Sequence, residues 1–140
     1  MGLETYDHLA ERLYEAHNDP IALVRCQNKL EIPWILETVR RHIGYHAEIL
    51  DMGCGAGFIT NALGKAGHNV TGVDLSSSCL RIAEAKDGTG MVRYVQGDVY
   101  RLPFQRESFD VVVAMDLLEH VVDPQKLIVQ ATRVLRPGGL

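Results

Sequence analysis

The chain has 140 residues, of which 46% are hydrophobic and 23% are charged, and its formal net charge is −4. This length suits one domain with a hydrophobic core and is too short for two. The composition excludes a disordered or coiled-coil chain, and no run of lysine or arginine suggests a general nucleic-acid surface. We therefore expect no nucleic-acid partner.

The sequence also limits where the protein is expected to work. No stretch reaches the roughly 18 apolar residues of a membrane span, and the N-terminus has no apolar signal core. Three cysteines, Cys26, Cys54 and Cys79, form no CxxC motif, which argues against a disulfide framework and against a thiolate zinc site. These features favour a reducing, cytoplasmic location.

Residues 1–45 are predicted to be helical and to form an N-terminal lid or cap. One helix is expected from Tyr6 to His17. Further along, Pro33 is expected to start a helix, because its missing N–H is not needed in a first turn. Apolar residues at helical spacing follow it: Ile35, Leu36, Val39 and Ile43.

Residues 46–140 are predicted to form a core in which strands and helices alternate. Strands are expected at 48–52, 70–74, 91–96 and 109–115, and helices at 59–66, 77–85 and 124–135. The link 97–108 is too short for a confident helix. This alternation indicates a parallel sheet with helices on both faces, in which ligands bind beyond the carboxyl ends of the strands.

A glycine-rich turn follows the first of these strands. Gly53, Gly55 and Gly57 lie between the strand and the next helix. Glycines allow a sharp bend and a close approach of ligand to backbone, and the helix N-terminus offers free N–H groups. The turn by itself is also compatible with a strand-to-helix connection that binds no ligand.

Asp74 makes a bound nucleoside the better interpretation. It ends the second strand, 21 residues after Gly53, where an acidic residue can accept hydrogen bonds from ribose hydroxyls. The alternative is a helix cap or a solvated aspartate. The third glycine falls at 57, whereas the dinucleotide fingerprint needs it one residue later, so a nicotinamide-dependent oxidoreductase is the less favoured alternative.

Five motifs together resemble one superfamily. They are Ile49–Gly57, Val70–Asp74, Gly97-Asp98, Phe109–Val112 and Leu135–Gly139. Their order and spacing resemble the class I S-adenosylmethionine-dependent methyltransferases, from about residue 47 to the end of the chain. The resemblance implies S-adenosyl-L-methionine as cofactor and an α/β, doubly wound, Rossmann-like sheet behind N-terminal helices.

The resembling family continues, after the last motif, with a fifth strand and an antiparallel hairpin. We expect the fold of this chain to lack those C-terminal strands. The fourth strand would then have an uncovered edge, through which two copies could pair as a homo-oligomer. A non-catalytic fragment that binds cofactor is therefore a further alternative to an active enzyme.

The resemblance also implies which residues contact the cofactor. They are Asp51 for the ammonium group, the backbone of Gly53, Cys54, Gly55 and Gly57 for methionine and ribose, Asp74 and Leu75 for ribose and adenine, Asp98 and Val99 for the adenine ring, and Met115 and Asp116 beside the methionine. For Asp98, a turn-capping role is the alternative.

Within the superfamily, the segment 117–124 (LLEHVVDP) resembles the ubiquinone-biosynthesis O-methyltransferases. The Asn/Asp-Pro-Pro-aromatic signature of adenine and glutamine methyltransferases is absent. The resemblance implies O-methylation of a small acceptor of the phenol or quinol type. A lipid quinone as acceptor would also imply peripheral contact with a membrane.

Three side chains in this region suggest a second kind of chemistry. Asp116, Glu119 and His120 would share one face of a helical turn, where they could bind a divalent metal, or His120 could act as a general base. The resembling family carries an acidic-x-x-Glu-His segment here, and some members bind metal with it. The alternative is that Leu117 and Leu118 pack in the core while Glu119 and His120 cap the turn.

Overall fold

The computed structural model describes residue 14 and residues 20–140. Within them, four parallel strands form one sheet in the order β3-β2-β1-β4. The strands are β1 (Glu48–Met52), β2 (Asn69–Asp74), β3 (Arg93–Gln96) and β4 (Val111–Val113). The predicted parallel sheet is therefore confirmed, and its carboxyl edge carries the glycine turn.

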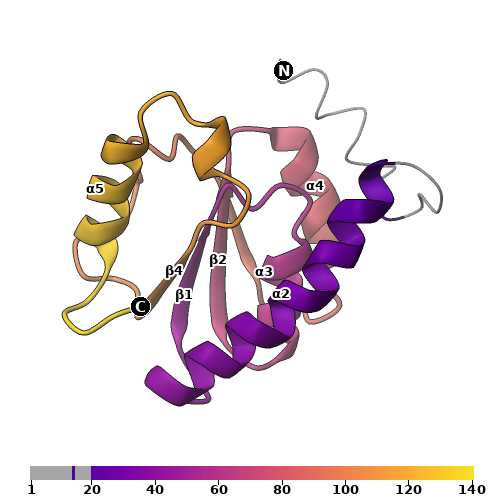
Figure 1. The fold of residues 1–140 in the computed structure, drawn as a ribbon, viewed down its shortest axis with the longest axis horizontal. Helices are drawn as coiled ribbons and strands as arrows, with labels where there is room; N and C mark the ends of the chain where they lie inside the picture. Colours follow the sequence, from indigo (N-terminus) through magenta and orange to yellow (C-terminus); the bar gives the residue numbers. More distant parts are fainter. Residues whose placement is uncertain (1–13, 15–19) are drawn as a thin grey trace.

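Helices lie on both faces of this sheet (Figure 1). The described helices are α2 (Pro20–His42), α3 (Phe58–Lys65), α4 (Ser77–Lys86), the single 3₁₀ turn η1 (Leu118–His120) and α5 (Pro124–Val134). The first three cover one face and α5 covers the other. Among residues 20–140, no helix combines the length and the apolar character needed to cross a membrane.

β1 divides the hydrophobic core into two parts. Ile49 packs with α2, α3 and the neighbouring strands, whereas Leu50 and Met52 point to the opposite face and pack with α5. Side chains of a strand alternate between faces, so a central strand covered on both sides must be apolar at nearly every position. The site at the tip of β1 therefore rests on a strand that is fixed from both sides.

Two helices begin where side-chain caps are available. Ser76 Oγ accepts a hydrogen bond of 3.2 Å from the backbone N–H of Cys79 at the start of α4. Asp123 Oδ1 accepts one of 3.1 Å from Lys126 N–H at the start of α5. Each cap satisfies an N–H group that the helix cannot pair internally, so the predicted helix starts are confirmed.

The N-terminal helix differs from the prediction. Pro33 lies inside α2, which runs without a break from Pro20 to His42, so the prediction that Pro33 starts a helix was wrong. A proline in a helix costs one backbone hydrogen bond. Ile35 and Val39 are buried against the sheet, and this packing holds the helix together across the proline. The expected helix from Tyr6 to His17 falls outside the described residues, apart from Tyr14.

β4 is shorter than the expected strand 109–115, because its flanking residues have other partners. The Asp110 carboxylate accepts a 2.8 Å hydrogen bond from Glu48 N–H and pairs with Arg136 at 2.8 Å. Phe109 forms an isolated bridge with Leu135. These contacts tie β4 to the segment after α5.

The sequence predicts an uncovered outer edge for β4. In the structure, part of this edge is paired. Leu140 N–H donates to Asp110 C=O at 3.0 Å, and Val112 N–H donates to Leu140 C=O at 2.9 Å. The backbone of Leu140 thus pairs with β4 in the position of a neighbouring parallel strand. This pairing satisfies part of the edge, which reduces its tendency to join another chain.

Leu63 tests the core packing described here. Its side chain is 0% exposed between α3 and the sheet. We expect Leu63→Ala to lower the free energy of unfolding by about 2–5 kcal/mol, because it removes buried methyl groups and leaves a cavity. Urea unfolding measures this loss. Leu30→Ala is the control, since Leu30 is 78% exposed and its truncation should change stability by less than about 0.5 kcal/mol. Equal losses would contradict the packing.

Candidate functional site

The glycine turn connects β1 to α3 and has the sharp bend that the sequence predicts. Gly53, Gly55 and Gly57 have φ angles of 71°, 52° and 81°, which are left-handed and unfavourable for other residues. The backbone N–H groups of Gly53 and Cys54 both donate to Val73 C=O, at 2.8 and 3.1 Å. The turn is therefore fixed to the end of β2, beside Asp74.

The glycines of the turn differ in what surrounds them. A Cβ atom on Gly53 would lie 2.8 Å from a methyl group of Leu117, and one on Gly57 would lie 2.5 Å from the hydroxyl of Tyr94. Among the described residues, no atom lies within 4 Å of a Cβ placed on Gly55. The packing thus explains two glycines, while no described residue fills the space beside Gly55, where a ligand can approach.

Asp74 borders that open space. Its Oδ2 accepts a 2.9 Å hydrogen bond from Gly55 N–H, and its Oδ1 accepts one of 2.9 Å from Ser76 N–H. Each carboxylate oxygen has a second lone pair, so two further donors can still bind. Leu75 follows with 51% of its side chain exposed, which leaves an apolar surface next to the carboxylate.

Asp51 lies beneath the turn and is 3% exposed. Its Oδ2 accepts a 2.6 Å hydrogen bond from the Thr60 hydroxyl. Burial raises the pKa of Asp51 to about 7; the Thr60 hydrogen bond opposes this shift and the negative charge of Asp74 adds to it. The Asp74 carboxylate makes the region under Gly55 electronegative, and Asp51 adds to this as it ionises near pH 7, which favours a cationic ligand.

The predicted adenine contacts lie at the carboxyl end of β3. Asp98 Oδ1 accepts a 2.8 Å hydrogen bond from Tyr100 N–H, so Asp98 does cap the turn that follows the strand. Gly97 N–H donates to Asp74 C=O at 3.0 Å, which places this turn beside Asp74. Val99 is buried in the α5 side of the core. The capping bond leaves lone pairs of the Asp98 carboxylate for a ligand.

Cys54 and Met115 border the same region. Cys54 is half-buried, and burial raises the pKa of its thiol, so it is a packing residue and not a nucleophile. Its Sγ atom lies 2.8 Å from the position that a Cβ atom on Gly72 would take, so only glycine fits beside it. Met115, after β4, packs against the α2 side of the core.

The structure does not assemble the predicted metal site. Only Leu118–His120 form a 3₁₀ turn, while Asp116 lies before it with a left-handed φ of 50°. Asp116 and His120 therefore do not share a helical face with Glu119. Within residues 20–140, no group of three or more His, Cys, Asp or Glu side chains is arranged to hold a metal ion. The residues here do not fit a divalent metal.

The same segment partly matches the alternative interpretation. Leu117 packs against the α5 side of the core, as that interpretation expects, but Leu118 is largely exposed. Asp116 Oδ1 accepts a 3.0 Å hydrogen bond from Gln27 Nε2 of α2. Sequence reasoning missed this contact, because no spacing rule connects two residues 89 positions apart.

Tyr14 is a second residue that the sequence did not single out. Its hydroxyl donates to Ala56 C=O in the glycine turn at 2.7 Å. Its ring stacks on Phe58 with centroids 4.2 Å apart, and Lys86 Nζ lies 5.0 Å from the ring centroid. Tyr14 therefore supports the turn from the N-terminal side. In the sequence around the glycine turn, Phe58 is the residue that could have indicated an aromatic partner.

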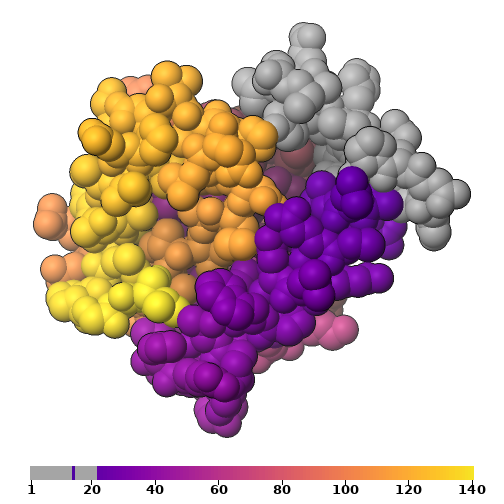
Figure 2. Space-filling view, in the orientation of Figure 1, coloured from indigo at the N-terminus to yellow at the C-terminus, as the bar shows by residue number. Residues whose placement is uncertain are grey.

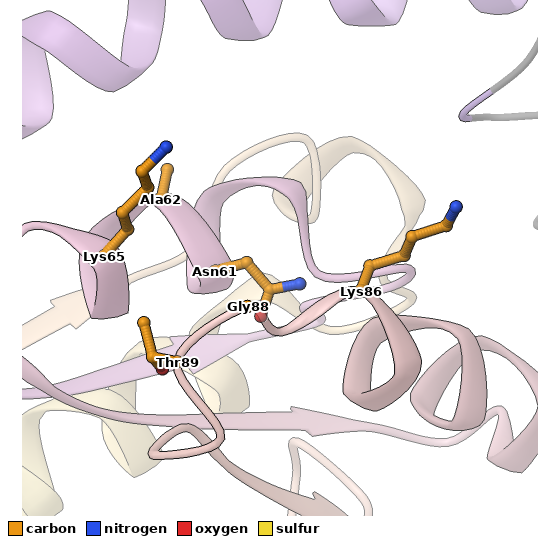
Figure 3. A pocket seen from close by; sticks show the side chains of 6 residues that line it. All are labelled: Asn61, Ala62, Lys65, Lys86, Gly88 and Thr89. Atoms are coloured by element: carbon orange, nitrogen blue, oxygen red, sulfur yellow. The ribbon is translucent and has the colours of Figure 1, made fainter.

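A cavity of about 430 Å³ lies elsewhere in the molecule (Figure 3). It is lined by Asn61, Ala62, Lys65, Lys86, Gly88 and Thr89. These residues come from α3, from the end of α4 and from the loop before β3. None of the predicted site residues lines the cavity, so it is separate from the glycine turn.

Comparisons with known proteins agree with this architecture. Residues 50–140 match the family described as "Methyltransferase domain". A ubiquinone biosynthesis O-methyltransferase of Coxiella burnetii is 40% identical over 93 residues, covering 65% of this chain and 40% of that protein. One of Bordetella pertussis is 32% identical over 145 residues, covering 98% and 57%. The chain thus spans about half the length of these relatives.

A solved structure shows the same fold. The crystal structure of a SAM-dependent methyltransferase from Methanosarcina mazei is 32% identical to this chain, with a TM-score of 0.65. The match covers 71% of this chain and 52% of that protein. The predicted Rossmann-like fold of class I methyltransferases is confirmed by this similarity together with the strand order.

Asp51 generates a pH prediction. The unfolded chain loses the Asp51 proton near its ordinary pKa of 3.8, whereas the folded chain keeps it to about 7. The free energy of unfolding therefore falls between these values as pH rises. Asp51→Asn has no carboxyl group at this position and therefore lacks this fall. The difference in free energy of unfolding between variant and wild type should shift in favour of the variant by about 1–3 kcal/mol from pH 5 to pH 8. Urea unfolding at both pH values measures the change.

Asp110→Asn provides the control for this measurement. Burial raises the pKa of Asp110, but hydrogen bonds from Glu48 N–H and Arg136 outweigh it and hold the pKa below the ordinary value. The stability that Asp110 contributes is lost only in acid, so its variant should show the same loss at pH 5 and pH 8. A pH-independent effect of Asp51→Asn would show that the buried carboxyl is ionised throughout.

Proposed function

Because this chain belongs to the methyltransferase domain family, we propose that it binds S-adenosyl-L-methionine and transfers a methyl group to a small-molecule acceptor. One observation carries the proposal: the Gly55 N–H donates to the Asp74 carboxylate, and no described atom lies within 4 Å of a Cβ placed on Gly55. The chain spans about half the length of its curated relatives, so its activity is a proposal.

The residues present suit this cofactor. Asp74 has lone pairs left for ribose hydroxyls, and the exposed part of Leu75 offers an apolar surface to adenine. Asp98 and the Val99 backbone would bind the adenine ring. The negative charge of Asp74, with Asp51 behind it, favours the cationic sulfonium and ammonium groups.

The cofactor supplies an activated methyl group, and the chain must align the acceptor and remove its proton. We assign the acceptor side to the carboxyl end of β4, where Met115 and Asp116 lie, and proton removal to His120 on η1. The names of the relatives support O-methylation of a phenol or quinol. No step is assigned to a metal, because the residues do not fit one.

The proposal also includes a location, a class of acceptor and a mode of pairing between copies. A cytoplasmic location is supported by the sequence, in which the three cysteines form no CxxC motif. A lipid quinone as acceptor, with the membrane contact that it would bring, is supported by the names of the relatives alone. Two copies could pair through the outer edge of β4. This pairing would have to use backbone N–H and C=O groups other than Asp110 C=O and Val112 N–H, which already bond to Leu140.

Calorimetric titration with S-adenosylhomocysteine tests the cofactor assignment. We expect micromolar binding by the wild type. Asp74→Ala should weaken it about tenfold to a hundredfold, because charge-assisted hydrogen bonds to the ribose are lost. Asp87→Ala is a matched control: Asp87 also accepts two backbone hydrogen bonds, from Thr89 and Val92, but it lies at the end of α4, and its loss should leave affinity unchanged.

A parallel titration with NADH distinguishes the main alternative. Tight binding of NADH without binding of S-adenosylhomocysteine would identify a nicotinamide site and overturn the proposal. Equal weakening by Asp74→Ala and Asp87→Ala would attribute the effect to general loss of structure.

A further inference from the structure

One polar contact joins α2 to the segment that follows β4. Gln27 Nε2 donates a 2.7 Å hydrogen bond to Glu31 Oε1 and a 3.0 Å hydrogen bond to Asp116 Oδ1. In the space-filling view, α2 (indigo) and the segment after β4 (orange) lie side by side (Figure 2). A single amide group therefore holds two carboxylates close together beside the end of β4.

The second oxygen of Glu31 is unpaired. Glu31 Oε2 is buried and has no hydrogen-bond partner in the described part of the chain. Buried polar atoms almost always have a partner, because leaving one unpaired forfeits the hydrogen bond that water would supply. This atom thus calls for a donor that residue 14 and residues 20–140 do not supply.

The neighbouring described groups explain why none of them donates to Glu31 Oε2. An amide nitrogen has two N–H groups, and Gln27 already uses both, on Glu31 and on Asp116. Asp116, as a carboxylate, only accepts hydrogen bonds. The missing partner must therefore bring its own hydrogen, and two nearby carboxylates disfavour an anion. A hydroxyl group meets both conditions.

The position of Glu31 connects it with the acceptor. Asp116 comes directly after Met115 at the carboxyl end of the strand that neighbours β1, where the proposed methyl transfer takes place. We propose that Glu31 binds the methyl acceptor by accepting, through Oε2, a hydrogen bond from one of its hydroxyl groups. This inference rests on the proposed function, because it concerns the same site.

Glu31→Leu in the full-length protein tests the inference, with catechol as a hydroxyl-bearing probe. Binding of catechol to protein saturated with S-adenosylhomocysteine should weaken about tenfold to a hundredfold, because a hydrogen bond to a charged group is lost. Binding of 1,2-dimethoxybenzene, which has the same ring but no O–H donor, should be equal in both proteins.

Thermal unfolding separates this role from a structural one. Glu31→Leu should unfold close to the wild-type temperature, since the hydrogen bond that Gln27 loses is exposed, so water can replace Glu31 Oε1, and the buried oxygen Oε2 is removed with it. Glu37→Leu is the matched control on α2: Glu37 pairs with exposed Arg40 and Arg41, and its loss should leave catechol binding unchanged.

The outcomes distinguish the two proposals. If the wild type binds S-adenosylhomocysteine but catechol either fails to bind or binds Glu31→Leu equally well, the role of Glu31 is overturned and the cofactor assignment stands. If the wild type does not bind S-adenosylhomocysteine, the proposed function itself fails. A marked loss of thermal stability in Glu31→Leu would show that Oε2 has a structural partner, which also overturns the inference.

Discussion

The hydrogen bond from Gly55 N–H to the Asp74 carboxylate is the interaction on which the site depends. It forms because β1 and β2 are parallel neighbours, with Met52 opposite Val73, so the residues that follow each strand meet at one edge. The left-handed conformations of the glycines turn the backbone N–H groups toward β2. The result is a turn whose backbone is hydrogen-bonded directly to the half-buried Asp74 carboxylate.

Charge is concentrated under this surface at a cost in stability. Asp51 is buried close to Asp74, and burial together with the neighbouring charge raises its pKa into the neutral range. Thr60 of α3 supplies a hydrogen bond that partly offsets the burial. Functional sites commonly keep such unfavourable arrangements, since the same field that destabilises a buried carboxyl attracts a cation. The buried Glu31 Oε2, for which the described residues supply no hydrogen-bond partner, is a second example.

Local sequence patterns predicted the core of the fold well and its long-range contacts poorly. The four strands in their chain order, the glycine turn and the starts of α4 and α5 each follow from a few neighbouring residues and were predicted correctly, while β3 and β4 are shorter than predicted. Pro33 was misjudged because the burial of α2 against the sheet outweighs the local penalty of a proline. Contacts such as Gln27 with Asp116 join distant segments, and only the folded chain brings them together. The presence of Asp74 at the turn was predicted, but its bond to Gly55 was not.

The most direct test of this account is a map of backbone amide NMR shifts during titration with S-adenosylhomocysteine. The account predicts the largest shifts at Gly55 and Leu75, which flank the Asp74 carboxylate, and smaller ones at Val99, whose backbone is proposed to bind adenine. Amides around the separate cavity, at Lys65 and Thr89, should not shift. Shifts confined to that cavity, or none at the glycine turn, would contradict the assignment of the site.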